Sequence, residues 1–189
     1  MSNKTSFYDQ SDLENLGFKF IGKNVKISRK CSIYGAERQT IGDHVRIDDF
    51  CLLSGALHIG RHVHIAAYCG LFGGAGIFLD DFSGLSSRVS IYSESDDYSG
   101  EAMTNPTIPM EFRKVQSDRV SVGRHVIVGA GAVILPGVSL GDGVAVGALS
   151  LVTKDLAAWG IFTGNPARYI KDRKHDLLTY EAKLLSHPV

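Results

Sequence analysis

Aliphatic residues recur at every sixth position over most of this chain, and neither an α-helix nor an isolated β-strand produces that period. The residue after each such position is often glycine, and the fourth residue after it is usually small or β-branched. This pattern is typical of a parallel β-helix, in which each six-residue unit supplies one short strand and a corner. The recurring positions are Ile21, Ile27, Ile33, Ile41, Ile47, Leu53, Ile59, Ile65, Leu71, Leu79, Leu85, Ile91, Val122, Val128, Ile134, Leu140, Val146 and Val152.

The six-residue units group in threes. The register is unbroken from Ile41 to Leu71, slips by two residues after Ile33 and again near Ile77, and otherwise holds. Three units then make one triangular coil, and stacked coils lie about 4.8 Å apart as parallel strands. We therefore expect an all-β fold, a prism of stacked coils whose recurring aliphatic residues point inward and form a dry core.

Sequence outside the repeat divides the chain further. Ser11 and Glu14 have capping-box spacing and predict a short helix that covers the open first coil. Near the end of the chain, leucines stand at helical spacing: Leu177, Leu178, Leu184 and Leu185. They predict an amphipathic helix that packs on the prism or on a neighbouring subunit. We expect a single domain over 1–189: an N-terminal helical cap at 1–20, coils at 21–95, an inserted active-site loop at 96–120, coils at 121–157 and a C-terminal extension with a helix at 158–189.

Charge and composition limit the partners. The chain has 20 basic and 20 acidic side chains among 189 residues, so no basic surface for nucleic acid is expected. The N-terminus lacks a basic and apolar signal, and no apolar run approaches the length of a membrane span. We expect a cytoplasmic protein without nucleic-acid or membrane partners.

Three cysteines test the register. Cys31, Cys51 and Cys69 each stand four places after the middle unit of their coils, which predicts one column inside a corner. Free cysteine behaves as a small buried hydrophobic residue, and neighbouring rungs of a parallel sheet orient the Cβ atoms poorly for a disulfide. We expect reduced thiols, with neither a metal nor a disulfide bond.

The histidines also follow the repeat. His44 and His62 share the third place after their recurring positions with His125, so His44 and His62 should stack on adjacent rungs at a corner, with Asn24 below. His58, His62 and His64 have the spacing of a metal triplet, but successive units turn to different faces. His58 and His64 therefore do not converge easily within one chain, and we predict no metal site.

A long interruption separates Ile91 from Val122. Its centre is polar and rich in turn-forming residues, from Ser95 to Gly100 and on through Pro106 and Pro109. Ordered loops of this length in compact domains are usually functional, although a spacer or a clasp between subunits is the alternative. A loop on a rigid prism is also a simple way to build a site beside a flat face.

Three segments of the later repeat carry a resemblance to a known family. The stretches Val122–Val138, Leu140–Asp155 and Thr163–Arg168 contain, in order, ILPGV, VTKD and GNPAR. This run closely resembles the hexapeptide-repeat acetyltransferases of the galactoside, maltose and xenobiotic type, and the resemblance covers roughly residues 20 to 172. It implies that the predicted prism winds left-handed, as a left-handed parallel β-helix, against the usual right-handed crossover rule.

The resemblance also implies a homotrimer that binds acetyl coenzyme A between adjacent prisms. The pantetheine arm of the donor would run along the last coils, and the basic residues near the C-terminus could pair with phosphates. The small residues Gly129, Ala130, Gly147 and Ala148 suit the pantetheine arm, and Thr153, Lys154 and Arg168 match positions that contact the nucleotide end. Arg168 also belongs to a basic cluster with Lys171, Arg173 and Lys174, whose alternative role is an ordinary solvated surface.

The inserted loop departs from the family pattern. Galactoside-type enzymes carry a His-Pro pair there, and this chain has Asp96 and Asp97 instead. A hydroxyl acceptor needs a general base near neutral pH, whereas an amine needs only its neutral lone pair. The absence of this histidine favours N-acetylation, or a general base from another part of the chain. His64 is the best candidate for such a base. Asp96 and Asp97 would orient the acceptor, or they would simply serve as turn residues.

We therefore expect an acetyl-coenzyme-A-dependent acyltransferase that acetylates a hydroxyl or an amine of a sugar or sugar nucleotide, in surface polysaccharide biosynthesis. Backbone amides of the prism would stabilise the oxyanion of the attacked thioester. Two alternatives stay open on the same prism: a metalloenzyme similar to gamma-type carbonic anhydrases, and a non-catalytic trimeric scaffold.

Overall fold

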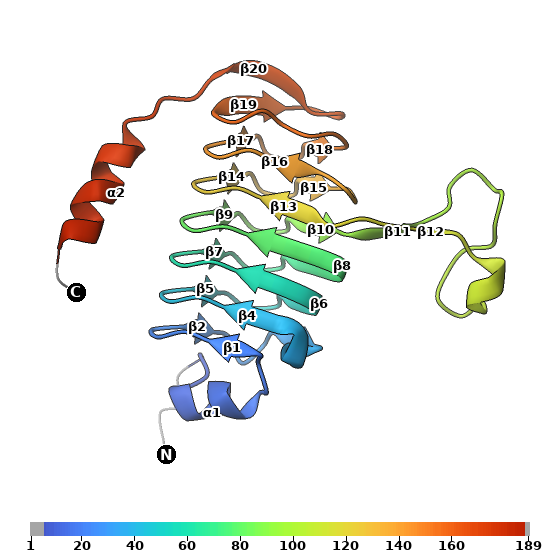
Figure 1. The fold of residues 1–189 in the computed structure, drawn as a ribbon, viewed down its shortest axis with the longest axis horizontal. Coiled ribbons are helices and arrows are strands. Elements are labelled where there is room, and N and C mark those ends of the chain that lie inside the picture. The colour runs from blue at the N-terminus through green and yellow to red at the C-terminus, as the bar shows by residue number, and fades with distance from the viewer. Residues whose placement is uncertain (1–5, 188–189) are drawn as a thin grey trace.

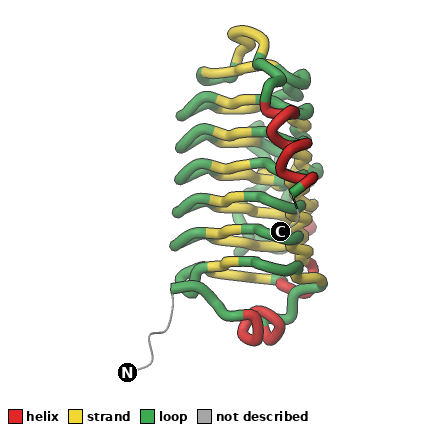
Figure 2. Tube along the Cα trace, turned by 90° about the vertical axis from the view of Figure 1, so that its left-hand side faces the viewer, coloured by secondary structure: helices red, strands yellow, loops and turns green. Residues whose placement is uncertain are grey.

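The protein is a stack of parallel coils with a helix near each end and one arm projecting from its side, as the computed structural model shows for residues 6–187 (Figure 1). Viewed from the side, successive coils lie one above another as nearly level layers (Figure 2). Parallel pairing joins each coil to the next along three faces, and the prediction of an all-β stack of coils is confirmed. Within the described residues, no helix is long and apolar enough to cross a membrane.

The first face contains the opening strand of each coil. Its strands pair through the recurring positions, Ile21 with Ile41, Ile41 with Ile59, Leu79 with Val122 and Val122 with Leu140. The strands are β1 (Phe20–Ile21), β4 (Gln39–Ile41), the second part of β6 (Leu52–Ile59) and of β8 (Gly70–Leu79), β13 (Val120–Val122) and β16 (Ser139–Leu140).

The second and third faces repeat the same arrangement. The second face contains β2 (Lys26–Ile27), β5 (Arg46–Ile47), β7 (His64–Ile65), β9 (Gly84–Leu85), β14 (Ile127–Val128), β17 (Ala145–Val146) and β19 (Gly160–Thr163). The third contains β3 (Ser32–Tyr34), the first parts of β6 and β8, β10 (Ser90–Tyr92), β15 (Val133–Ile134) and β18 (Leu151–Val152). The stack closes with β20 (Arg168–Asp172), which pairs antiparallel with β19.

The recurring aliphatic residues form the core, as predicted. All of them are buried except Ile21 and Ile33, which are partly buried and pack against the core near its N-terminal end. The two slips of register are absorbed outside the strands. A 3-10 helix, η1 (Ala36–Arg38), follows the first slip, and the pairing of β6 with β8 shifts between Gly55 and Leu57 at the second. Extra residues therefore widen a corner without moving the core positions.

The cysteines lie on successive rungs, which confirms the predicted column. Each Sγ donates a hydrogen bond to a backbone carbonyl: Cys31 to Asp48 at 3.1 Å, Cys51 to Ala66 at 3.2 Å and Cys69 to Ser86 at 3.1 Å. All three are free thiols. Hydrogen bonding to Cys51, followed by burial, raises the pKa of Cys31 and Cys69, so these two thiols are held in the neutral form.

Both terminal helices form, with one correction at the first. Helix α1 (Gln10–Asn15) is capped by Asp9, whose side chain accepts the backbone N–H of Asp12 at 2.9 Å, so Ser11 lies inside the helix and is not its cap. Asp9 has the same capping chemistry two residues earlier, and it removes Ser11 from the cap position. Leu13 of α1 is buried against the first coil. Helix α2 (Leu177–Ser186) is described with its contacts below.

Candidate active site

The interruption of the repeat forms an arm whose base is a two-stranded ribbon. Strand β11 (Glu94–Asp96) pairs antiparallel with β12 (Val115–Ser117), and the 3-10 helix η2 (Met110–Phe112) lies nearer the tip. Buried Ser93 fixes the base, because its Oγ donates to the carbonyl of Phe72 at 3.0 Å and accepts the N–H of Ala75 at 3.0 Å. The arm projects away from the prism beside β10 (Figure 1). Sequence analysis predicted the insertion but not this ribbon.

A pocket lies between the base of the arm and the last coils. We call it the arm pocket, and its volume is about 700 Å³. Its lining includes Asp96, Asp97, Leu135, Leu151 and Thr153. Asp96 ends β11, Asp97 directly follows it, and Thr153 directly follows β18. The pocket thus joins two predicted acceptor-side residues to one predicted donor-side residue, although they are far apart in the sequence.

The two aspartates of the arm differ in their environments. Asp97 accepts hydrogen bonds from the hydroxyl of Ser99 at 2.7 Å, the N–H of Ser99 at 2.9 Å and the N–H of Ala102 at 3.1 Å. The bonds from Ser99 come first among the causes that lower the pKa of Asp97 to about 2. Within the described residues, the carboxylate of Asp96 accepts one hydrogen bond, from the N–H of Asn105 at 3.2 Å. Asp97 is therefore a turn residue, and Asp96 is the carboxylate that has capacity for a ligand.

The small residues predicted to lie along the donor occupy one corner of the later coils. Ala130 and Ala148 are exposed there, directly after Gly129 and Gly147. A side chain at Gly129 would meet the backbone of the next rung, and one at Gly147 would meet Thr163. Rung packing therefore explains both glycines without a ligand, and none of these four residues lines the arm pocket.

The basic residues near the C-terminus have different roles. Lys154, Arg168 and Lys171 are exposed near the end of the stack, where they remain available to an anion, but they do not line the arm pocket. Arg173 is not available in this way, because its Nη1 donates to the carbonyls of His125 at 2.7 Å and Gly143 at 3.0 Å. Burial lowers the pKa of Arg173. This guanidinium anchors the C-terminal segment to the prism.

His64 lies outside the arm pocket. It belongs to β7 on the second face, and its Nε2 lies 2.8 Å from Oδ2 of Asp48. The other carboxylate oxygen, Oδ1 of Asp48, accepts a hydrogen bond from Nε of Arg46 at 2.7 Å. Burial alone would raise the pKa of Asp48, but the hydrogen bonds from His64 and Arg46 outweigh burial and lower it. His64 lines a separate shallow pocket with Ser86 and Ser87. Within one chain, the structure does not bring His64 together with Asp96.

The corner ladder predicted from the third place of each unit is present. The rings of His44 and His62 stack with centroids 4.7 Å apart, and Nδ2 of Asn24 lies 3.5 Å from Nε2 of His44. Phe82 continues the stack between His62 and His125, with centroid distances of 4.9 and 5.1 Å. All five residues have left-handed backbones with φ between 56° and 60°. The ladder is a structural feature of the corner, away from the arm.

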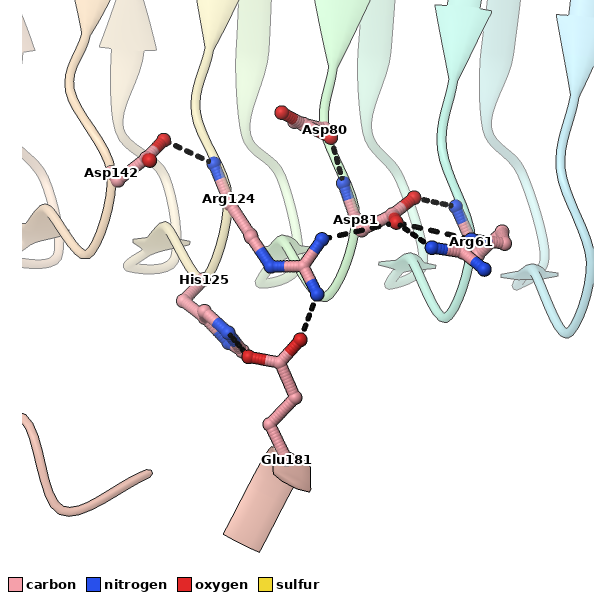
Figure 3. Close-up of polar contacts among 7 residues, drawn as sticks. All are labelled: Arg61, Asp80, Asp81, Arg124, His125, Asp142 and Glu181. Carbon is pink, nitrogen blue, oxygen red and sulfur yellow. Dashed lines mark hydrogen bonds and ion pairs between the residues drawn. The ribbon is translucent and has the colours of Figure 1, made fainter. Parts of the chain in front are cut away.

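Helix α2 is tied to this corner by one acidic side chain. Glu181 accepts hydrogen bonds from Arg124 and from Nε2 of His125, the latter at 2.7 Å (Figure 3). Arg124 also pairs with Asp81 at 3.2 Å, and Asp81 pairs with Arg61 at 2.7 Å. Leu178, Leu184 and Leu185 of α2 are exposed. The predicted helix is confirmed, but the contacts of Glu181 with the prism are polar, and these three leucines are uncovered.

Residues 6–187 contain no group of three or more histidine, cysteine, aspartate or glutamate side chains placed to hold a metal ion. His58 pairs with Thr40 at 2.9 Å and stacks on Phe78, while His64 pairs with Asp48 on another face. The two histidines line different pockets, as their positions in the repeat predicted.

Comparison with known proteins defines the class. The family model for the bacterial transferase hexapeptide, described as six repeats, matches residues 119–154. The dTDP-4-amino-4,6-dideoxy-D-glucose acyltransferase of Escherichia coli is 43% identical over 180 residues, which cover 94% of each chain. The chain therefore belongs to the hexapeptide-repeat acyltransferases, and the predicted family and enzyme class are confirmed.

Two solved structures and one further relative are also similar to this chain over most of its length. The N-acyltransferase AntD from Bacillus cereus, in complex with dTDP and 3-hydroxybutyryl-CoA, is 48% identical with a TM-score of 0.94, over 96% of this chain and 97% of that chain. A variant of AntD has been solved with dTDP-4-amino-4,6-dideoxyglucose and coenzyme A. The putative lipopolysaccharide biosynthesis O-acetyl transferase WbbJ of Escherichia coli K12 is 29% identical over 156 residues, 79% of this chain and 76% of its own.

Proposed function

We propose that this protein transfers an acetyl group from acetyl coenzyme A to the amine of an amino sugar carried on a nucleoside diphosphate. The observation that carries the proposal is the arm pocket, in which Asp96 and Thr153 face the same space. The relatives named for action on dTDP-4-amino-4,6-dideoxyglucose, or solved with it, support a sugar-nucleotide acceptor. AntD, which binds coenzyme A and its 3-hydroxybutyryl thioester, supports the donor.

The chemistry requires little from the protein beyond positioning. The neutral amine attacks the thioester carbonyl carbon, a C–N bond forms, and the C–S bond breaks as the tetrahedral intermediate collapses. The amine loses one proton and the departing thiolate gains one, so coenzyme A leaves as the free thiol. We assign Asp96 to orient the amine and accept its proton, and exposed backbone N–H groups of the last coils to stabilise the oxyanion.

The donor would lie along the later coils with its thioester in the arm pocket. Ala130 and Ala148 leave room for the pantetheine of the donor beside the corner. Thr153 would contact this pantetheine where it enters the arm pocket. Lys154, Arg168 and Lys171 would hold the phosphates at the outer end, because exposed cations pair well with phosphate oxygens. Gly129 and Gly147 contribute by allowing close rung packing.

The proposed assembly is a cytoplasmic homotrimer. The uncovered leucines of α2 and the projecting arm both present surfaces that a neighbouring prism could cover. His64 reaches an arm pocket only if that pocket belongs to a neighbouring protomer, and the role as a base that the sequence suggested for it, as the alternative to Asp96, depends on this contact. Light scattering that gives the mass of a monomer would remove both the trimer and this role for His64.

The test is the rate of thiol release from acetyl coenzyme A with paired acceptors. dTDP-4-amino-4,6-dideoxyglucose should support turnover, while the matched sugar nucleotide with a hydroxyl at that carbon should not exceed background hydrolysis. The proposal is overturned if no amino sugar, free or nucleotide-linked, stimulates thiol release. A faster rate with the hydroxyl compound would replace N-acylation with O-acylation.

A further inference from the structure

The carboxylate of Asp96 is held by a residue from farther along the arm. The backbone N–H of Asn105 donates to Oδ2 of Asp96 at 3.2 Å, across nine residues of chain. Among the described residues this is the one hydrogen bond to the carboxylate, and Oδ1 has no donor. The last torsion of an aspartate side chain is broad and roughly two-fold, so a carboxylate without a fixed donor turns easily. The N–H of Asn105 therefore selects which oxygen of Asp96 is engaged and which one is open to a ligand.

The backbone of Asn105 is left-handed, with a φ of 72°. Within the part of the chain that the structure describes, every other non-glycine residue with a positive φ lies at a corner of the prism, three places after an aliphatic residue of the coils. The conformation recurs there because the same turn recurs with each rung. Asn105 lies in the arm, outside the repeat, and is exposed. Neither the geometry of the coils nor packing in the core explains its conformation.

The side chain of Asn105 stabilises the turn that produces this conformation. Its Oδ1 accepts the N–H of Thr107 at 3.0 Å and the hydroxyl of Thr107 at 2.5 Å, and its carbonyl accepts the N–H of Ile108 at 3.3 Å. Asparagine visits the left-handed region more readily than most residues, because its short polar side chain bonds locally in this way. The side chain thus holds the turn, and the turn directs the backbone N–H toward Asp96.

The rest of the arm supports this return of the chain. Asp97 holds the turn that begins the loop, and the N–H of Met103 donates to the carbonyl of Phe112 at 2.9 Å, which joins the two sides of the arm. Backbone conformations that are sparsely populated persist where the surrounding structure fixes them, and they cluster at functional sites. The conformation of Asn105 is such a case, and its N–H contacts the carboxylate that lines the arm pocket.

The structure assigns Asn105 as the positioning residue for Asp96. Its left-handed backbone holds Oδ2, which leaves Oδ1 for the amine of the acceptor, and Asn105 acts only through Asp96. This assignment rests on the proposed function, because it takes Asp96 to orient the amine and accept its proton. A misplacement of about 1 Å at a catalytic group can cost about 100-fold in rate, so a residue outside the chemistry can still control it.

Steady-state thiol release tests the assignment with variants that differ in their tolerance of a positive φ. Asn105→Val should lower kcat about tenfold and leave the KM for acetyl coenzyme A unchanged, because a β-branched residue rarely adopts this conformation. Asn105→Gly should stay within about threefold of the wild type, because glycine adopts it readily. The matched control is Asn24→Val, which places the same strain at a prism corner and should keep the wild-type kcat.

A double variant separates positioning from a general effect on the arm. In an Asp96→Ala background, Asn105→Val should change the remaining kcat by about twofold or less, because the partner through which Asn105 acts is already absent. The assignment is overturned if Asn105→Val keeps the wild-type kcat, if Asn105→Gly loses as much as Asn105→Val, or if Asn105→Val lowers kcat by the same factor with and without Asp96.

Amide exchange followed by nuclear magnetic resonance gives a check that does not depend on turnover. In Asp96→Ala the amide of Asn105 should exchange about fivefold faster than in the wild type, because it has lost its acceptor. The amide of Ala102, which Asp97 binds, should not change. Equal exchange at Asn105 in both proteins would overturn the assignment. Failure of the proposed function has a different signature: the wild type releases no thiol with any acceptor, while exchange at Asn105 still depends on Asp96.

Discussion

Two neighbouring aspartates show how side chains of the same type acquire different roles. Asp97 uses its carboxylate to hold the turn at Ser99, and those hydrogen bonds lower its pKa to about 2. Such a carboxylate is a poor proton acceptor near neutral pH. Asp96, one residue earlier, lines the arm pocket. The sequence offered the pair as candidates, and Asp-x-Ser turn chemistry was the signal that separates them.

Replacement of each aspartate by asparagine should separate these roles. Asp96→Asn removes the acceptor for the amine proton, and kcat should fall about 100-fold with little change in the KM for acetyl coenzyme A. Asp97→Asn keeps an oxygen for the turn and should change kcat by about threefold or less. Steady-state thiol release measures both. A larger loss in the Asp97 variant than in the Asp96 variant would contradict the assignment.

The histidine ladder should give the protein a pH-dependent stability. Burial, and then the nearby His44 and Arg61, lower the pKa of His62, while Asp81 opposes them. A lowered pKa in the folded state means that stability is present above the ordinary histidine pKa of about 6.5 and is lost as the pH falls below it. Protonation of His62 would also place a second positive charge beside Arg61.

His62→Asn should reduce the loss of stability at low pH, because asparagine does not titrate. Asparagine also tolerates the left-handed backbone at this position. Denaturant unfolding at about pH 7.5 and 5.5 measures the change in the free energy of unfolding. The wild type should lose more stability than the variant over this interval, and exposed His187→Asn should behave as the wild type. An equal loss in all three proteins would show that His62 does not contribute.

At the scale of elements, the six-residue period predicted the rungs, the core and the side-chain columns. It could do so because each unit places one residue inward whatever lies on the outside. The ribbon of the arm was not predictable in this way, since Val115–Ser117 does not follow the six-residue period and pairs with a strand about 20 residues earlier in the sequence. The cap of α1 was misplaced because Asp9 and Ser11 carry similar capping chemistry.

Helix α2 should depend on Glu181 for its place beside the prism. Glu181→Gln removes the charge that both Arg124 and His125 contact, and the amides of α2 should exchange with solvent about fivefold faster as local opening becomes easier. Hydrogen exchange followed by mass spectrometry measures the change. Glu111→Gln, in η2 of the arm, is the matched control, and unchanged exchange in α2 of the Glu181 variant would show that other contacts hold the helix.

At the scale of the whole molecule, the prism is the support, and the arm forms the candidate site together with the last coils. Asp96 and Thr153 are brought together because the arm leaves the stack between β10 and β13, beside coils that follow it in the sequence. The sequence named Asp96 and Thr153, which line one pocket in the structure, but it could not place His64 relative to them, because the period gives the face of a residue and not its distance from an insertion.

Transfer of an acetyl group to nitrogen is the central proposal for this protein, and the chemical structure of the product tests it most directly. The protein, acetyl coenzyme A and dTDP-4-amino-4,6-dideoxyglucose are incubated together, and the sugar nucleotide is then examined by nuclear magnetic resonance. We predict one new acetamide on the amino carbon, formed in the same amount as free coenzyme A thiol. An acetyl ester on a hydroxyl, or thiol release with the amine unmodified, would contradict the account.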